Sequence, residues 1–550
     1  MPLVPCPLPL APESMLTLPL EPTDDRANPI FKDAASCAQW LGQLQLTNLH
    51  LAHSQLLTQI NEFNRYPMRG LERLNTLELL RETVSHVQED FARKLIGKPL
   101  PLNESELMVF QAIVQLWQSL VTGYQRSLQA YIASEKPLGK YGALLCQRCL
   151  LYSGLEIIEY LRTGYDFDAS LWHQLHELYA YAEQQEIHQM EVADPLSPLR
   201  NSCMSSYVKT LLACYASPAQ LTRWQLQQLD HWLSLWCNAV TVERRYSLIK
   251  GDALPLTTDL SSTQGLQQVA GLPHNDTLRF LAMVPLSKLL RVKIILLQQG
   301  QTPRQVGLGD HADSQSCLEL LNFLHQSWCE NQHQRVGERQ PVARHAQLCY
   351  KPEGIYAHLS GKPFQQSASD ADSLGRKLIA APARTPDHAQ KQLKIGYPLE
   401  SWHMEDESIT GARLIRSDAI GGRLKCKQLI ALRPGDALSF MLGITAWANV
   451  TQQGRLEIGI KYLPGQPEPV RISTSGIDPV GKEKHAPAFL LPALPSLNIP
   501  ASLIIPRDWF QDNRVIELLH PDGQISRAKL GFSVERGLDY ERASFTPVVT

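Results

Sequence analysis

A carboxylate, a hydroxyl and a glycine stand close together in the last third of the chain, in the string Asp406-x-Ser408-x-x-Gly411. The string leads into a strand-like run over residues 412–416, so it predicts a turn at the entry to a strand. At such a turn the two oxygen-bearing side chains can project onto one outer face. Glycine lets a ligand or another backbone segment approach closely.

Two arginines four positions apart, Arg335 and Arg339, follow an expected helix upstream of this turn. Arginine suits phosphate and guanine because its planar fork matches both and its flat face stacks on a base. Two guanidinium groups on a mobile segment, facing the Asp406–Ser408 pair, could clamp an anionic purine ligand. The barrel or sheet that carries this turn must therefore bring residues 335–339 within reach of it.

Length and composition narrow the class of protein. A chain of 550 residues has room for two to four domains with their own cores. The formal net charge of −2 argues against a DNA- or RNA-binding protein that relies on bulk charge. Eleven cysteines, an odd number scattered over the chain, favour a reducing, cytoplasmic setting over a disulfide framework.

No segment predicts a signal peptide or membrane insertion. The N-terminus is interrupted by prolines and lacks a basic region before its apolar residues. The most apolar late stretch, residues 489–506, contains four prolines that forbid a continuous spanning helix.

The N-terminal half predicts an all-α helical bundle over residues 27–333, after a Pro-rich, poorly ordered segment at 1–26. Asn103 with Glu106 predicts a capping box before one amphipathic helix. Ser217 and Pro218 predict the cap and first position of another, and a last helix is expected to end near Gln332. Apolar stripes of this kind must pack on one another, which favours a bundle.

After about residue 340 the pattern becomes that of short strands. Residues 346–350 and 355–359 look extended, and 456–462 alternates as a half-buried strand. A polar segment at 362–395 predicts a flexible insertion. We expect a β-barrel over 334–478 and a second β unit, packed on the barrel, over 479–550, which contains a hairpin at 515–530. The predicted fold class is thus multidomain α+β.

Residues 335–475 resemble the PilZ family of bacterial cyclic-di-GMP receptors. The resemblance rests on the two arginines, on the Asp406-x-Ser408-x-x-Gly411 turn, and on three segments that look like later barrel strands, at 432–436, 446–448 and 456–460. Members of that family hold the nucleotide, often as an intercalated dimer, against the outside of a small antiparallel β-barrel. The helical portion and the tail lie outside the resemblance.

The resemblance implies a role for each of the five motif residues. Arg335 and Arg339 would contact phosphates and guanine edges, and Asp406 would accept hydrogen bonds from guanine N–H groups. Ser408 would hydrogen-bond the base or a phosphate, and Gly411 would leave room for the ring. Ligand binding in the family moves the arginine segment, which here joins the helical region to the barrel, so ligand could reorient one against the other.

Each motif also has a structural interpretation. Arg335 and Arg339 could simply end the preceding helix, where cations favour the helix dipole. Asp406 and Ser408 could form a turn that closes onto its own backbone. These alternatives predict no ligand.

Other candidate chemistry is weaker. Cys146 and Cys149 form a single C-x-x-C pair in an apolar helical run, which favours two buried thiols over a metal or redox site. His173 and His176 lie on a polar helical stretch without the H-E-x-x-H order, which favours a solvated face. We find no catalytic constellation, and we expect neither an enzyme nor a bound cofactor or metal.

The sequence therefore predicts a cytoplasmic, non-enzymatic second-messenger receptor that binds cyclic-di-GMP on its barrel and signals through the helical region to a protein partner. The alternative is a degenerate PilZ-like adaptor that binds no nucleotide and acts through protein contacts alone. The identity of the partner and the oligomeric state, a homo-oligomer included, stay open.

Overall fold

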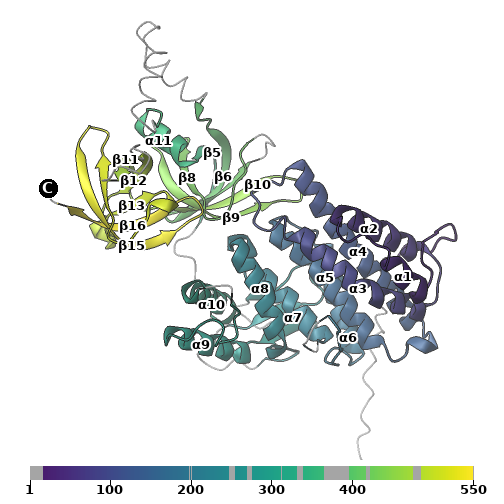
Figure 1. The fold of residues 1–550 in the computed structure, drawn as a ribbon. Coiled ribbons are helices and arrows are strands. Elements are labelled where there is room, and N and C mark those ends of the chain that lie inside the picture. The colour runs from purple at the N-terminus through teal and green to yellow at the C-terminus, as the bar shows by residue number, and fades with distance from the viewer. Residues whose placement is uncertain are drawn as a thin grey trace, which may run out of the picture.

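The computed structural model describes residues 16–196, 199, 201–246, 254–268, 275–310, 313–330, 339–364, 396–416, 421–474 and 485–548. A helical region forms one side of the molecule, and two β-barrels lie next to each other on the other side (Figure 1). The predicted α+β class, with helices first and β structure after them, is confirmed. No helix among these residues is long and apolar enough to cross a membrane.

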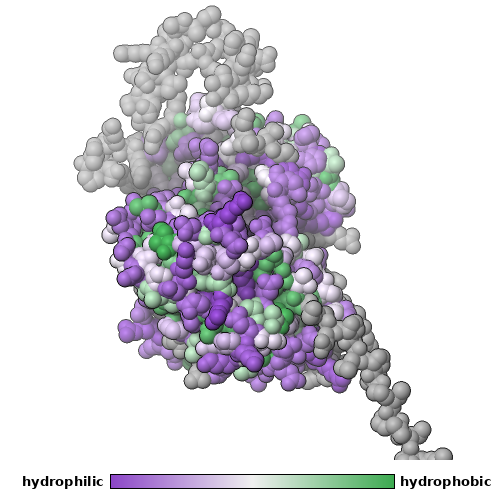
Figure 2. Space-filling model, turned by 90° about the vertical axis from the view of Figure 1, so that its right-hand side faces the viewer, coloured by the Kyte–Doolittle hydropathy of each residue, from purple (hydrophilic) through white to green (hydrophobic). Residues whose placement is uncertain are grey.

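Ten α-helices build the helical region of the described chain. They are α1 (Ala34–Leu41), α2 (Leu49–Arg65), α3 (Gly70–Ala92), α4 (Glu104–Ile132), α5 (Gly142–Thr163), α6 (Ser170–Gln184), α7 (Cys203–Tyr215), α8 (Arg223–Trp236), α9 (Val284–Gln298) and α10 (Ser314–Cys329). The face at the α1–α6 end carries apolar residues scattered among polar ones (Figure 2). Most apolar stripes are therefore turned inward, as the periodicity predicts.

Local signals explain several helix ends. Asn103 accepts a hydrogen bond from the Glu106 N–H at 2.9 Å, and the Glu106 carboxylate accepts from the Asn103 N–H at 3.1 Å, so the predicted capping box is present. The prediction at Ser217 was wrong, because Pro218–Gln220 forms a separate short 3-10 helix. Thr222 caps α8 instead.

The prediction that residues 27–333 are all-α was wrong, because the helical region also contains a small sheet. Its strands are β1 (Thr241–Glu243), β2 (Leu256–Asp259), β3 (Gln267–Gln268) and β4 (Leu278–Ala282), in the order β1-β4-β2-β3. Strands of two to five residues leave too short a pattern to be separated from loops.

The first barrel is closed and six-stranded. It contains β5 (Gln340–Tyr350), β6 (Glu400–Ser408), β7 (Gly411–Arg416), β8 (Leu429–Pro434), β9 (Met441–Val450) and β10 (Leu456–Tyr462), in the order β10-β7-β6-β5-β8-β9. All neighbouring pairs are antiparallel, and β9 pairs with β10 to complete the circle.

The second β unit is also a closed six-stranded barrel. Its strands are β11 (Glu468–Thr474), β12 (His485–Leu491), β13 (Ser502–Ile505), β14 (Val515–Leu519), β15 (Ile525–Arg536) and β16 (Glu541–Val548), in the order β11-β12-β13-β16-β15-β14. The predicted hairpin at 515–530 is present as β14 and β15. Since β11 belongs to this barrel, the second barrel begins before the predicted boundary at 478/479.

Two strand predictions need correction. Residues 355–359 lie in a helix, α11 (Pro352–Ser360), which packs beside the barrels. Strand β10 is not half-buried as predicted, because its first five residues, 456–460, are all buried; among them Glu457 pairs with Arg413 at 2.8 Å. The segment 365–395 of the predicted insertion and residues 1–15 of the N-terminus lie outside the described residues.

Backbone hydrogen bonds connect the helical region to the first barrel. Leu100 and Leu424 exchange two bonds of 2.8 Å, and the Val450 N–H donates to the Gly164 carbonyl at 2.8 Å. Between the two barrels, the Leu538 N–H donates to the Lys427 carbonyl at 2.7 Å. The three bodies are therefore fixed to one another at several points along the chain.

Candidate functional site on the first barrel

The predicted Asp406-x-Ser408-x-x-Gly411 turn is the tight connection between β6 and β7. Ser408 pairs with Gly411 across it, and Ile409 at its tip is 92% exposed. The Tyr462 N–H on β10 donates to the Thr410 carbonyl at 2.9 Å, which holds the turn against the barrel. The turn thus presents its side chains on a fixed rim of the first barrel.

Arg339 reaches this turn although 67 positions separate it from Asp406. Its Nη1 donates to Asp406 Oδ1 at 2.8 Å and to Oδ2 at 3.2 Å. The contact follows from the topology, because Arg339 directly precedes β5, and Pro341 on β5 pairs with Asp406 on β6. The side chains are 31% and 22% exposed, so both remain accessible from the solvent.

Arg335, the other predicted arginine, lies outside the described residues. Arg339 stands at the start of a strand rather than at the end of α10, which ends at Cys329. The alternative in which Arg339 merely ends the preceding helix is therefore wrong.

Ser408 and Gly411 have local structural roles. The Ser408 hydroxyl donates to the Gly411 carbonyl at 3.2 Å, which closes the turn onto its own backbone. A Cβ atom at Gly411 would lie 2.0 Å from the Ile460 carbonyl oxygen, so the neighbouring strand requires glycine there. The packing of β10 thus gives a structural reason for glycine at this position, and the ligand role that the resemblance implies for Gly411 stays a prediction.

Two more arginines extend the charged surface around the turn. Arg344 on β5 donates to Glu407 and to Asp436, and Arg413 on β7 donates to Glu457. We call these arginines, Arg339 and their carboxylate partners the barrel ion network. Sequence reasoning missed Arg344 and Arg413 because each is a single charge in a strand. Only the strand pairing places them beside the turn.

Tyr462 adds a phenol to this network. Its O–H donates to Glu407 Oε1 at 2.9 Å. Burial, and then the adjacent Glu407 carboxylate, raise the pKa of Tyr462 well above its usual range, so the phenol stays protonated as a donor. The network therefore offers guanidinium, carboxylate and phenol groups that are all held by neighbours.

The cysteine pair and the two histidines that the sequence analysis considered differ in how deeply they are buried. Cys146 and Cys149 are fully buried, and burial raises the pKa of the Cys146 thiol to about 12, which fits structural thiols. His173 is exposed as predicted. His176 is not on a solvated face: it is fully buried, and its Nε2 donates to the Gln264 carbonyl at 2.8 Å. Within the described ranges, no group of three or more His, Cys, Asp or Glu side chains could hold a metal ion.

Two family models match the chain on either side of the first barrel. Residues 35–246 match the model described as "Cyclic-di-GMP receptor FimW, N-terminal domain". Residues 476–548 match the "FimW C-terminal beta-barrel domain", which corresponds to most of the second barrel. Each match shows similarity to one FimW domain over the matched segment. Neither model covers the first barrel, so its likeness to PilZ stays a prediction.

A curated relative is similar over most of the chain. The "Cyclic-di-GMP receptor FimW" of Pseudomonas aeruginosa is 22% identical over 568 aligned positions, which cover 92% of this chain and 90% of the relative. The similarity therefore includes the first barrel and the connection between the helical region and the barrels.

Proposed function

We propose that this protein is a non-enzymatic cyclic-di-GMP receptor that binds the dinucleotide at the barrel ion network and passes the signal through its helical region to a protein partner. Similarity to the cyclic-di-GMP receptor FimW, over most of the chain and in the N-terminal domain, supports the ligand. The observation that supports the site is the contact between Arg339 and Asp406, which unites the two predicted motifs at one rim of the barrel.

The chemistry of this rim suits a guanine nucleotide. A guanidinium group can donate two parallel hydrogen bonds to a phosphate, and a carboxylate can accept from guanine N–H groups. In the described structure Arg339 and Asp406 are bonded to each other. Such a partly exposed pair contributes only about 0–1 kcal/mol, so a ligand can replace it at little cost.

Isothermal titration calorimetry of the intact chain with cyclic-di-GMP tests this proposal. We expect Arg339→Ala and Asp406→Ala each to weaken binding by at least tenfold, because each leaves part of the ligand without a partner. Arg527→Ala is the matched control: Arg527 also forms an exposed pair on a barrel strand, with Glu517 at 2.8 Å, but on the second barrel. Binding that is unchanged in both site variants would refute the site.

A second candidate function is a protein adaptor that binds no nucleotide. The Ser408–Gly411 hydrogen bond and the carbonyl of Ile460 against Gly411 favour it, because both explain motif residues without a ligand. The absence of binding heat and of a thermal shift at saturating cyclic-di-GMP would select the adaptor over the receptor.

A further inference from the structure

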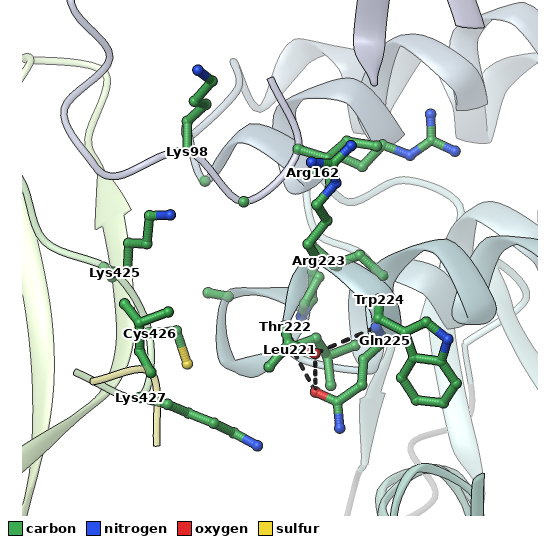
Figure 3. A pocket seen from close by; sticks show the side chains of 18 of the residues that line it. Lys98, Arg162, Leu221, Thr222, Arg223, Trp224, Gln225, Lys425, Cys426 and Lys427 are labelled. Atoms are coloured by element: carbon green, nitrogen blue, oxygen red, sulfur yellow. Dashed lines mark hydrogen bonds between the residues drawn. The ribbon is translucent and has the colours of Figure 1, made fainter. Parts of the chain in front are cut away.

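A cleft of about 800 Å³ lies where the helical region meets both barrels (Figure 3). The helical region contributes the loop at Gly97 and Lys98 and the start of α8. The first barrel contributes residues 424–427 between β7 and β8, and the second barrel contributes Arg507 and the end of β15. Its volume lies within the range of small-molecule sites, about 300–1,000 Å³.

The side chains that line this cleft are strongly biased toward positive charge. Seven of them are basic and two, Asp313 and Glu319, are acidic. Lys425, Lys427 and Arg507 form no ion pair with any carboxylate in the described part of the chain. In Figure 3, Lys425 and Lys427 extend from the barrel side toward the helical side, with open space before them. This local charge contrasts with the net charge of −2 for the whole chain.

Lys427 is held in the cleft by a constrained backbone. Its φ of 61° lies in the left-handed region, which costs a residue other than glycine, asparagine or aspartate about 1 kcal/mol or more. Its N–H donates to the Thr445 carbonyl at 2.6 Å, and its carbonyl accepts from the Leu538 N–H at 2.7 Å. The fold therefore fixes a lysine, at some cost, at the junction of the two barrels.

The start of α8 adds to the positive potential from the opposite wall. Thr222 caps this 14-residue helix and Arg223 is its first residue, and both line the cleft. The N-terminal end of a helix carries a partial positive charge that favours anions. Arg223 also donates to the Arg93 carbonyl at 3.0 Å, which fixes its position on this wall.

We propose that this cleft is a second binding site, separate from the barrel ion network, for an anionic ligand that carries two or more phosphate groups. Lys425 and Lys427 from the first barrel, Arg507 from the second and Arg223 from the helical region bind the phosphates. A ligand held by all three bodies stabilises their present arrangement. This inference stands on the geometry of the cleft and does not depend on the barrel site.

Calorimetry and thermal shift on the full chain test the proposal with three probes: inorganic pyrophosphate, GTP and cyclic-di-GMP. The test variant is Lys425→Gln/Lys427→Asn, since asparagine tolerates a positive φ. The matched control, Lys140→Gln/Lys529→Gln, removes two exposed lysines elsewhere. We expect the test variant to weaken at least one probe by tenfold or more while it unfolds at the same or a higher temperature than the wild type.

The pattern across the probes distinguishes the sources of the phosphates. If the test variant binds pyrophosphate and GTP more weakly, the ligand of the cleft is a linear polyphosphate. If it binds only cyclic-di-GMP more weakly, the ligand is the cyclic dinucleotide. In either case Arg339→Ala is expected to leave this part of the binding unchanged, because Arg339 lies outside the cleft. Equal weakening in the test and control variants, or no binding of any probe to the wild type, would overturn the proposal.

Discussion

Two of the arginine–carboxylate networks among the described residues lie in contrasting surroundings, one inside the helical region and one on the outside of the first barrel. Inside, Arg81 donates to Asp194 at 2.6 Å and Arg148 donates to Glu78 at 2.9 Å. Arg81, Arg148 and Asp194 are at most 4% exposed, whereas Arg339 and Arg344 in the barrel ion network are about 30% exposed.

The difference in burial separates a structural network from an exchangeable one. Burial alone would raise the pKa of Asp194, but hydrogen bonding and charge from Arg81 and Arg148 hold it below its usual value. That network must stay paired, since an unpaired charge in the interior is costly. The barrel ion network can lose a pair to water or to a ligand at little cost.

Removal of one member of the buried network is expected to have the largest effect. Arg148→Met leaves Arg81 as the one arginine shared by Glu78 and Asp194 and should lower the free energy of unfolding by about 3–5 kcal/mol. Urea denaturation followed by tryptophan fluorescence measures this loss. Arg527→Met, which breaks an exposed pair, is the control and should cost less than about 1 kcal/mol. Similar losses in the two variants would contradict the distinction.

The sequence predicted the helices and strands that have a repeating pattern, but it did not predict contacts between distant segments. Apolar periodicity and caps predicted the helical region and the strand-rich half, because long elements repeat their pattern. The contact of Arg339 with Asp406 required the pairing of β5 with β6 across an intervening segment, which periodicity does not encode. Arg344, Arg413 and the cleft at Lys427 were missed for the same reason: they come together only through tertiary structure.

Glu156, a buried carboxylate on α5, sharpens the comparison, because no arginine in the described part of the chain forms an ion pair with it. Burial raises the pKa of Glu156 to about 7, although Gln118 donates to it at 2.7 Å. As pH rises, Glu156 ionises in the unfolded chain before it ionises in the folded protein. The contribution of Glu156 to the stability of the folded protein is therefore full below about pH 4.5 and is lost as pH rises through about 7. Glutamine does not ionise, so Glu156→Gln should raise the free energy of unfolding at pH 8 by about 3 kcal/mol relative to the wild type. The estimate follows because one pKa unit is worth about 1.4 kcal/mol.

Unfolding curves of the wild type and Glu156→Gln at pH 5 and pH 8 measure this effect. The variant should gain little at pH 5 and most at pH 8. Glu72→Gln on α3 provides a control, since that side chain is only partly buried and accepts a hydrogen bond from the Ala34 N–H. A gain that is independent of pH would show that the effect comes from packing rather than from ionisation.

Gly411 tests whether the turn in the barrel network is shaped by packing. Gly411→Ala would place a methyl group against the Ile460 carbonyl and should cost about 1–3 kcal/mol even without ligand. Gly396→Ala is the control, because no atom of the described residues lies within 4 Å of its added Cβ. Thermal unfolding without ligand compares the two variants. If both lower the unfolding temperature by the same small amount, packing does not explain the glycine at position 411, and ligand binding remains as the reason for it.

The smallest effect on stability is expected at Arg339 itself. Arg339→Gln breaks its pair with Asp406, yet both side chains can be solvated, so the free energy of unfolding should fall by less than about 1 kcal/mol. Because salt screens accessible charges, this small difference should shrink further between 0.05 and about 1 M NaCl. The Arg148→Met loss should persist over that range. If Arg339→Gln instead lowers stability as much as Arg148→Met, the barrel ion network holds the fold together, and a ligand could not displace it cheaply.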